Sequence, residues 1–472
     1  MRIIFAASEV VPYAKTGGLA DVAAALPKAL MTLGCDISIV MPRYRTINAG
    51  QLIIDAMPVP FAGRRYCSVW FDRLGSLPVY FIDAPQYFHR SGLYGESDDV
   101  ERFAFYCRAV LELCKRIGPP PDVIHCNDWM TGLIPVYLNS NYAADPYFFK
   151  TATILTIHNL AFQGLFDPSS FGLFDLDPSL LYGEKGLEFG GVASTLKGGL
   201  LHCDAITTVS RRYAQEIQTP EYGFRMDGIL RYRRYSLIGI LNGIDEDEWD
   251  PTSDKYLPAH YSIVNLAGKA ICKRELLKTF NLPIELDRPL LAIVSRMTDQ
   301  KGFDLIIKAM DRILETKAML VVLGSGADKY ERYFQALRDS HPDRVGVYFG
   351  FNNPLAHQIE AGADIFLMPS YYEPCGLNQM YSLRYGTVPI VRATGGLDDT
   401  VENFDRARMR GNGFKFYDYD VNQFVERVYE ALLTYADKDV WHQLIINGMS
   451  QDFSWASSAR KYLDVYHAVR RD

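Results

Sequence analysis

Short apolar runs alternate with longer amphipathic segments along the whole chain, and this alternation constrains the fold more than any other feature. In the first half, we interpret as strands the runs 2–7, 36–41, 78–83, 123–125, 152–158, 205–209 and 237–241. In the second half, the corresponding runs are 290–295, 319–323, 345–349, 365–368 and 389–391. Most are rich in valine and isoleucine on both faces, as strands buried in a parallel sheet require. The alternation therefore predicts βαβα units, with parallel sheets covered by helices.

The length and the spacing of these runs predict two domains. A chain of 472 residues is too long for a single hydrophobic core, and two domains of about 200 residues each are expected. After Trp249, a looser segment with Pro251 and Pro258 separates the two sets of runs. We therefore predict an α/β fold of two doubly wound, Rossmann-like domains, residues 1–245 and 246–452, that face each other across a cleft.

The last segment of the chain, SWASSARKYLDVYHAVRR, has the pattern of an amphipathic helix. Its apolar residues recur at near-helical spacing and form a stripe that needs a partner: Trp455, Tyr462, Val465 and Val469. Because the second predicted sheet already has enough helices for both of its faces, we expect helix 453–472 to cross back onto the first domain. Packing of this helix on its own domain is the alternative.

Composition narrows the classes of partner. The chain is 48% hydrophobic and 22% charged, which is ordinary for a soluble globular protein, and its net charge is -7. Without a basic face, nucleic acid and anionic membranes are not expected partners. No apolar run reaches the roughly 18 residues that span a membrane. The eight cysteines form no CxxC pair and no zinc-type spacing, so we expect no metal site and a reducing, cytoplasmic location.

Polar residues and glycines gather after the predicted strands, where ligands bind in open α/β sheets. These segments begin KTGGL at Lys15, HCND at His125, HNLAFQG at His158, NGID at Asn242, SRMTDQKG at Ser295, PSYYEPCGLNQ at Pro369 and TGGLDDTV at Thr394. A glycine pair at a strand exit indicates that something approaches the backbone closely or that the turn needs positive φ. The first loop is not GxGxxG, so the dinucleotide fingerprint of a dehydrogenase is absent.

Arg296 and Lys301 lie five residues apart after a predicted buried strand. An arginine fork and a lysine point charge together suit a diphosphate. The alternative is a pair of solvated surface cations. Their place at a strand end, followed by Gly302, favours the phosphate site.

Three further side chains have both a structural and a functional interpretation. Glu373 precedes a Pro-Cys-Gly turn, where it can accept hydrogen bonds from sugar hydroxyls or merely cap the following helix. His158 and Asp128 each end a predicted strand and can be satisfied structural groups. Their shared sheet edge with Lys15 and Asn242 favours a site.

Together, seven segments resemble those of bacterial glycogen synthases and plant starch synthases. They are KTGGLADV, HCNDWMTGL, TIHNLAFQG, LNGIDEDEWDP, SRMTDQKGFDLI, MPSYYEPCGLNQMYSLRYGTVPIV and ATGGLDDTV, in this order. The resemblance runs from Met1 to the C-terminal FSWASSARKYLDVY. It implies a metal-independent enzyme with the GT-B fold. Such an enzyme transfers glucose from ADP-glucose to the non-reducing end of an α-1,4-glucan with retention, releases ADP and needs no cofactor.

The same resemblance implies a role for each matching residue. Lys15 contacts the nucleotide diphosphate beside the amides of Gly17 and Gly18, while Arg296 and Lys301 hold the phosphates from the other domain. The glucose is held by a further set: Asp128, His158, Asn242, Glu373 and the amides of Cys375, Gly376 and Leu377. The acceptor side is lined by Glu9, Asp21 and Tyr94. Many related retaining enzymes carry a second glutamate eight residues after the first; here that position is Tyr381, so ribose-binding roles are not carried over.

The chemistry follows from the leaving group. A departing nucleotide diphosphate needs positive charge placed in advance, which Lys15, Arg296 and Lys301 supply. Retention through a covalent intermediate needs a carboxylate nucleophile about 5 Å from an acid, and the sequence offers no clear candidate. The resemblance implies front-face attack, in which the departing phosphate takes the acceptor's proton.

Two other functions stay open at this point. One is a different GT-B enzyme, such as a sucrose-type transferase or a sugar-nucleotide epimerase, against which the combination of KTGGL with EPCGLNQ argues. The other is a non-catalytic glucan-binding relative. The presence of Lys15, Arg296 and Lys301 argues against it, because a protein that only binds glucan does not need to bind a diphosphate.

Overall fold

The computed structural model describes residues 1–471, which form two compact units. The first contains Met1–Gly243 and the C-terminal segment that begins at Trp455. The second contains Ile244–Ser454. The chain therefore leaves the first unit two residues before the boundary that we expect from the sequence, and it returns at Trp455.

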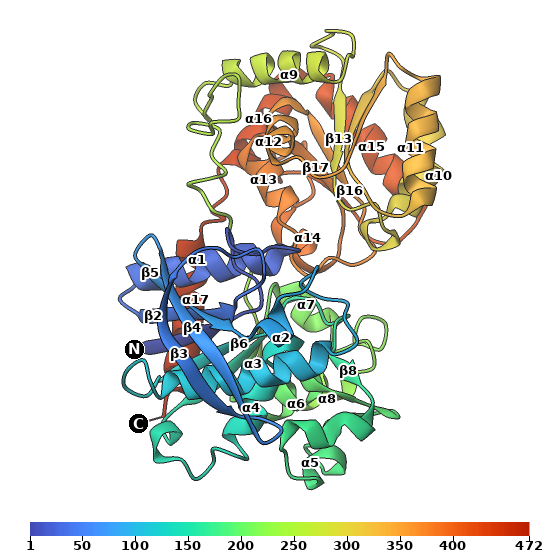
Figure 1. Ribbon diagram of the computed structural model, residues 1–472. Helices are drawn as coiled ribbons and strands as arrows, with labels where there is room; N and C mark the ends of the chain where they lie inside the picture. The colour runs from blue at the N-terminus through green and yellow to red at the C-terminus, as the bar shows by residue number, and fades with distance from the viewer. Residues whose placement is uncertain (472) are drawn as a thin grey trace. The chain divides into compact units, whose positions relative to one another are not determined.

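Within residues 1–471, the first unit is built on a nine-stranded sheet (Figure 1). The strands of this unit are β1 (Arg2–Ala6), β2 (Asp36–Pro42), β3 (Gln51–Pro60), β4 (Arg64–Leu74), β5 (Leu77–Asp83), β6 (Val123–Asn127), β7 (Ala152–Ile157), β8 (Leu165–Phe166), β9 (Glu188–Phe189), β10 (Val192–Ser194), β11 (Ala205–Thr208) and β12 (Leu237–Gly239). The order of the large sheet is β12-β11-β7-β6-β1-β2-β5-β4-β3. From β12 to β5 all neighbours are parallel, whereas β4 and β3 pair antiparallel at one edge. Strands β8, β10 and β9 form a separate small antiparallel sheet.

The central strands form because their residues suit burial on both faces. Every residue of β6 and β7 is buried, as is all of β1 except Arg2. The α-helices of the first unit are α1 (Gly18–Thr32), α2 (Pro85–Phe88), α3 (Asp99–Cys114), α4 (Leu133–Leu138), α5 (Ser179–Tyr182), α6 (Thr195–His202), α7 (Arg211–Glu216), α8 (Asp227–Tyr232) and α17 (Trp455–Val469). This agrees with the helix-covered parallel sheet that the alternation predicts.

Residues 244–454 form the second unit, which is built on a six-stranded parallel sheet. Its strands are β13 (Leu290–Val294), β14 (Met319–Gly324), β15 (Val345–Phe349), β16 (Ile365–Met368), β17 (Val388–Arg392) and β18 (Phe414–Phe416), in the order β15-β14-β13-β16-β17-β18. Its helices are α9 (Ala267–Thr279), α10 (Phe303–Leu314), α11 (Asp328–Ser340), α12 (Asn353–Gly362), α13 (Asn378–Arg384), α14 (Gly395–Thr400), α15 (Val421–Tyr435) and α16 (Lys438–Met449). One apolar cluster joins β13, β14 and β16 to α9 and α12.

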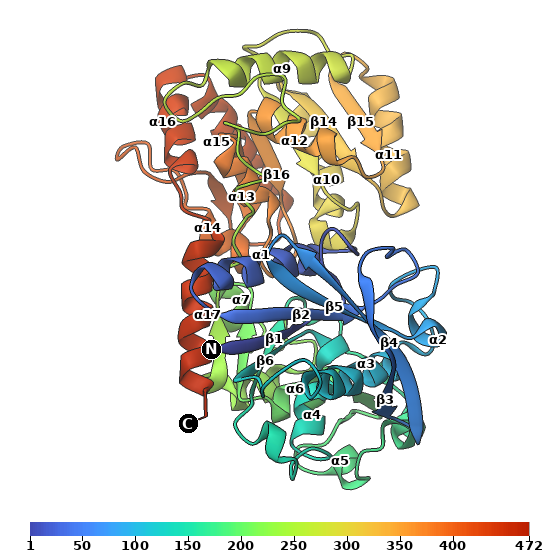
Figure 2. The ribbon, with the colours of Figure 1, turned by 60° about the vertical axis from the view of Figure 1, so that its left-hand side comes forward.

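The C-terminal helix α17 belongs to the first unit. It packs against α1 and β7, and Figure 2 shows it in red beside the blue strands β1 and β2. Ser458 Oγ donates to the carbonyl oxygen of Leu241, and the hydroxyl of Tyr466 lies 2.7 Å from Nδ1 of His125. Tyr462 and Tyr466 are fully buried. The apolar stripe of this helix thus lies against the sheet of the first unit.

Each parallel sheet has one point where the strand order reverses, and ligands bind at such points. In the first unit it lies between β1 and β6, which pair directly. In the second unit it lies between β13 and β16. The KTGGL loop and Asp128 follow the first pair of strands, and the segments with Arg296 and Glu373 follow the second pair.

Three findings concern the wider chemistry of residues 1–471. No helix in this range is long and apolar enough to cross a membrane. The eight cysteines are buried free thiols. No group of three or more His, Cys, Asp or Glu side chains in the described chain is arranged to hold a metal ion.

Candidate functional site

The KTGGL loop lies on the surface of the first unit, between β1 and α1. Lys15 to Gly18 are all exposed. The Lys15 ammonium donates to Asp21 Oδ1 at 2.7 Å. Because both side chains are accessible to water, with 47% and 27% exposure, this pair holds Lys15 only weakly.

The carboxylate of Glu9 fixes the backbone of this loop by hydrogen bonds. Its side chain is buried, and its Oε2 accepts the backbone N–H of Thr16 and, at 3.2 Å, that of Gly17. Its Oε1 accepts the Thr16 hydroxyl at 2.8 Å and the Tyr94 hydroxyl at 2.7 Å. One carboxylate thus accepts hydrogen bonds from four donors. Three of these donors belong to Thr16 and Gly17, so Glu9 holds the backbone of the loop directly.

Asp128 and His158 lie together at the carboxyl ends of β6 and β7. Asp128 Oδ1 accepts the backbone N–H of His158 at 2.7 Å, and its own N–H donates to Thr156 at 2.9 Å. Asp128 adopts φ 55° and ψ -169°, a strained conformation for a residue with a side chain. Such strain persists where the surrounding structure enforces it, and it is concentrated at functional sites.

Burial sets the charge of both groups. It raises the pKa of Asp128 to about 7, although backbone N–H groups of His158 and Asn159 oppose this shift. Burial also lowers the pKa of His158 to about 3, so its imidazole is neutral. Asn127 Nδ2 donates to Ala6, which turns Asn127 Oδ1 toward His158 Nε2 at 2.8 Å. The proton therefore lies on Nε2, and Nδ1 of His158 is left as an acceptor for a hydroxyl group.

Asn242 follows β12 at the same edge of the sheet. Its side chain is 5% exposed, and its Oδ1 has no hydrogen-bond partner among residues 1–471. A buried amide oxygen without a partner is unfavourable, typically by about 1–3 kcal/mol. This oxygen is therefore available to a hydrogen-bond donor from outside the protein.

In the second unit, the structure brings Lys301 and Glu373 together. Lys301 Nζ donates to Glu373 Oε2 at 2.5 Å, and Ser370 Oγ lies 3.1 Å from the same oxygen. Arg296 is exposed, and its guanidinium has no hydrogen bond or ion pair within the described part of the chain. The segments after β13 and β16 thus carry a free cation, Arg296, and a second cation, Lys301, that is already paired to a carboxylate.

The turn after Glu373 is fixed by its neighbours. Gly376 has φ +74°, where a side chain would be strained, and Gln379 Nε2 donates to the carbonyl oxygens of Cys375 and Gly376. The amides of Gly376 and Leu377 donate to no group within residues 1–471. The TGGL loop approaches this turn so closely that a Cβ on Gly396 would overlap the Cys375 carbonyl oxygen. This close approach explains the second glycine pair of the sequence.

The predicted residues thus form local groups: Lys15 with Asp21, Glu9 with Tyr94 and Gly17, Asp128 with His158, and Lys301 with Glu373. Sequence reasoning missed the residues that support them, namely Ser8, Thr16, Asn127 and Ser370. Thr16 could have been found, since it lies between Lys15 and the glycine pair. The others carry no signal beyond their place at strand ends.

Two family descriptions match the chain. The starch synthase catalytic domain matches residues 2–232, and glycosyl transferases group 1 match residues 277–447. The first range lies within the first unit and the second lies within the second unit.

Relatives match over the whole length. The chain is 47% identical to glycogen synthase 1 of Geobacter metallireducens, covering 100% of this chain and 96% of that one. It is 48% identical to the glycogen synthase of Koribacter versatilis, covering 100% and 99%.

Solved structures agree with these matches. The catalytic domain of starch synthase IV from Arabidopsis thaliana, bound to ADP and acarbose, superposes with a TM-score of 0.92 at 35% identity over 99% of both chains. Sucrose-phosphate synthase from Thermosynechococcus elongatus superposes with a TM-score of 0.63 at 17% identity, over 99% of this chain and 98% of that one, which shows a shared fold alone. The protein has the GT-B fold of these structures. The chain belongs to the glycogen and starch synthase family.

Proposed function

We propose that this protein is a retaining glucosyltransferase that elongates an α-1,4-glucan from ADP-glucose and releases ADP. The observation that carries the proposal is the pairing at the end of β13 and β16. A free, exposed guanidinium at Arg296 lies near in sequence to Lys301, which is bonded to the buried carboxylate of Glu373. That set suits a diphosphate next to a hydroxyl-rich sugar. Sequence identity of 47% and 48% to two glycogen synthases over the whole chain supports this substrate class.

The donor's phosphates are assigned to Lys15, Arg296 and Lys301, with the amides of Gly17 and Gly18 beside Lys15. The exposed Lys15–Asp21 pair contributes at most about 1 kcal/mol, so a doubly charged phosphate can displace Asp21. Three cations placed in advance stabilise the charge that develops as the glycosidic C–O bond breaks. The proposal needs no cofactor. A starch synthase bound to ADP supports the nucleotide assignment.

The transferred glucose is assigned to polar groups of both units. Asp128, Glu373 and His158 Nδ1 accept hydrogen bonds from hydroxyl groups, and Asn242 Oδ1 gains a donor. The amides of Cys375, Gly376 and Leu377 supply donors in return. Neutral His158 suits this role, because an imidazolium would have no acceptor left.

The proposed chemistry is front-face attack. The acceptor hydroxyl approaches the anomeric carbon on the side from which the diphosphate leaves, its oxygen forms the new C–O bond, and its proton passes to the departing phosphate oxygen. The protein contributes orientation and electrostatic stabilisation, as in phosphoryl transfer. Glu9, Asp21 and Tyr94 are assigned to the acceptor side. We place the enzyme in the cytoplasm, without a nucleic-acid or membrane partner.

The test measures nucleoside diphosphate release from ADP-glucose and from UDP-glucose, each with and without glycogen. We expect release from ADP-glucose that depends on glycogen. Release that is independent of an acceptor would indicate a hydrolase, and release that needs fructose 6-phosphate or another small sugar would favour a sucrose-type transferase. Binding of glycogen without any release would favour the non-catalytic alternative.

A further inference from the structure

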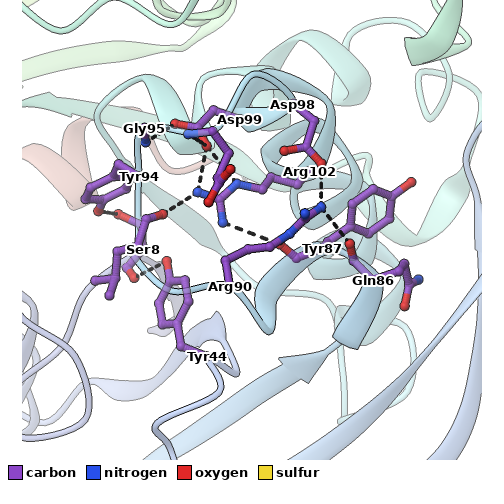
Figure 3. A network of polar contacts seen from close by, with 12 residues as sticks. Ser8, Tyr44, Gln86, Tyr87, Arg90, Tyr94, Gly95, Asp98, Asp99 and Arg102 are labelled. Carbon is purple, nitrogen blue, oxygen red and sulfur yellow. Dashed lines mark hydrogen bonds and ion pairs between the residues drawn. The ribbon is translucent and has the colours of Figure 1, made fainter.

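An ion pair on α3 between buried Arg102 and half-buried Asp99 contacts the segment around Tyr94 (Figure 3). From Tyr94, further hydrogen bonds lead through Glu9 to the glycine loop. Arg102 has no exposed surface. Its Nε donates to Asp99 Oδ1 at 2.9 Å and its Nη2 donates to the same oxygen at 2.7 Å. None of the roles proposed above involves these two residues.

This pair holds the peptide groups on both sides of Tyr94. Arg102 Nη2 donates to the carbonyl oxygen of Leu93, the residue before Tyr94. Asp99 Oδ2 accepts the backbone N–H of Gly95, the residue after it, at 2.8 Å. With its backbone fixed on either side, Tyr94 has little freedom to move its hydroxyl.

Tyr94 connects this fixed segment to Glu9 through its hydroxyl group. Its hydroxyl donates to Glu9 Oε1 at 2.7 Å and lies 2.7 Å from Ser8 Oγ. Burial raises the pKa of Tyr94 well above its usual value, so the hydroxyl keeps the proton that it donates. Glu9 in turn accepts the amides of Thr16 and Gly17.

The loop itself has little else to hold it. Lys15 to Gly18 are exposed, and a Cβ placed on Gly17 would meet no atom within 4 Å. A phosphate site must nevertheless be placed in advance, because donors that have to reorganise lose much of their catalytic effect. We propose that Arg102 and Asp99 are positioning residues for the KTGGL loop, acting through Tyr94 and Glu9 on the donor's diphosphate. The inference rests on the proposed function, from which the phosphate role of this loop comes.

The experiment compares Asp99→Asn and Arg102→Lys with Arg108→Lys as a matched control. Arg108 is a second buried arginine on α3, but its Nε donates to Pro60 at 2.7 Å and its guanidinium lies over the ring of Tyr137. Each of the three variants weakens or removes part-buried hydrogen bonds of one helix. Only the first two disturb the contacts that lead to the loop.

Two readouts separate positioning from stability. We expect Asp99→Asn and Arg102→Lys to raise KM for ADP-glucose about tenfold. A change of this size corresponds to the loss of roughly one hydrogen bond between the misplaced loop and the donor. Hydrogen exchange of the peptide covering residues 12–22 should also speed up, since the amides of Thr16 and Gly17 lose their fixed acceptor. Arg108→Lys should lower Tm and leave both readouts at wild-type values.

Equal KM and equal exchange in all three variants, with only Tm reduced, would overturn the inference. If a variant does not fold, Tyr94→Phe removes the connecting hydroxyl without opening a large cavity, and it must speed exchange in the same peptide. The two proposals fail separately. A wild-type protein that releases no ADP refutes the proposed function, and the exchange measurement still decides whether α3 orders the loop.

Discussion

At the scale of single residues, the two cations of the second unit differ in what their removal does. Lys301 neutralises a buried carboxylate, so its loss leaves Glu373 as an uncompensated buried charge. Arg296 has no such partner within residues 1–471 and is exposed. Only Arg296 can therefore report on phosphate binding free of a change in stability.

We predict that Arg296→Ala lowers kcat/KM for ADP-glucose about a hundredfold, or roughly 3 kcal/mol, the typical effect of losing one charged contact to a developing anion. Its Tm should stay within about 1 °C of wild type, because surface substitutions change stability little. Arg332→Ala, which removes an exposed arginine of α11, is the control and should leave both values unchanged. Near-normal kinetics in Arg296→Ala would remove this residue from the phosphate site.

Asp128 makes a prediction about pH. Asp128 has a pKa of about 7 in the folded protein, whereas the ordinary pKa of an aspartate, which applies to the unfolded chain, is 3.8. Between these values the folded state binds more protons, so the stability contributed by this group falls as pH rises through the window. Asp128→Asn should therefore gain stability relative to wild type from pH 5 to pH 7, by roughly 2–3 kcal/mol at about 1.4 kcal/mol per unit. Urea unfolding at several pH values measures this, and parallel curves for the two proteins would contradict it.

At the scale of elements, α17 joins the sheet of the first unit through a buried polar chain. Tyr466 contacts His125 Nδ1, and His125 Nε2 lies 2.6 Å from Thr156 Oγ1, which meets Thr207 Oγ1 at 2.6 Å. Burial lowers the pKa of His125 to about 3, so the ring is neutral and needs a partner on each nitrogen.

We predict that Tyr466→Phe lowers the free energy of unfolding by about 1–3 kcal/mol, since it leaves one nitrogen of a buried imidazole unpaired. Tyr182→Phe removes a hydroxyl from a side chain that is 72% exposed, and it should be neutral. Denaturant unfolding followed by circular dichroism compares the two. A neutral Tyr466→Phe would show that this contact adds nothing to the attachment of α17.

The sequence predicted parallel strands better than the edge of the sheet. The run 345–349 and the run 365–368 match β15 and β16 residue for residue, because each is a short apolar run with a polar or turn-forming residue at either end. The hairpin of β3 and β4 was not predicted. Strand β3 is largely exposed, contains Pro58 and Pro60 and carries two shifts of register, so it lacks a continuous apolar run.

Residues of the candidate site also differ in how well the sequence predicts them. Residues that end buried strands, such as Asp128 and His158, could be predicted because position alone brings them to one sheet edge. The contacts of Arg102 and Asp99 could not, because they depend on how a loop 9 residues away in sequence folds back on α3. Periodicity carries no information about such irregular backbone.

At the scale of the whole molecule, each unit presents its polar residues at the reversal point of its own sheet. The chain passes between the units twice, at Gly243–Ile244 and at Ser454–Trp455. Around these passages, the backbone N–H of Ile244 donates to the carbonyl oxygen of Phe453 at 2.9 Å. The roles assigned under the proposed function fall on residues of both units.

The most direct test supplies ADP-glucose labelled with ¹³C at C1 of the glucose, together with glycogen, and follows the product by NMR while ADP is measured. We expect the label to appear as α-1,4-linked glucose, with one ADP released for each residue added. Labelled free glucose, a β-linked product or no incorporation by folded protein would contradict it.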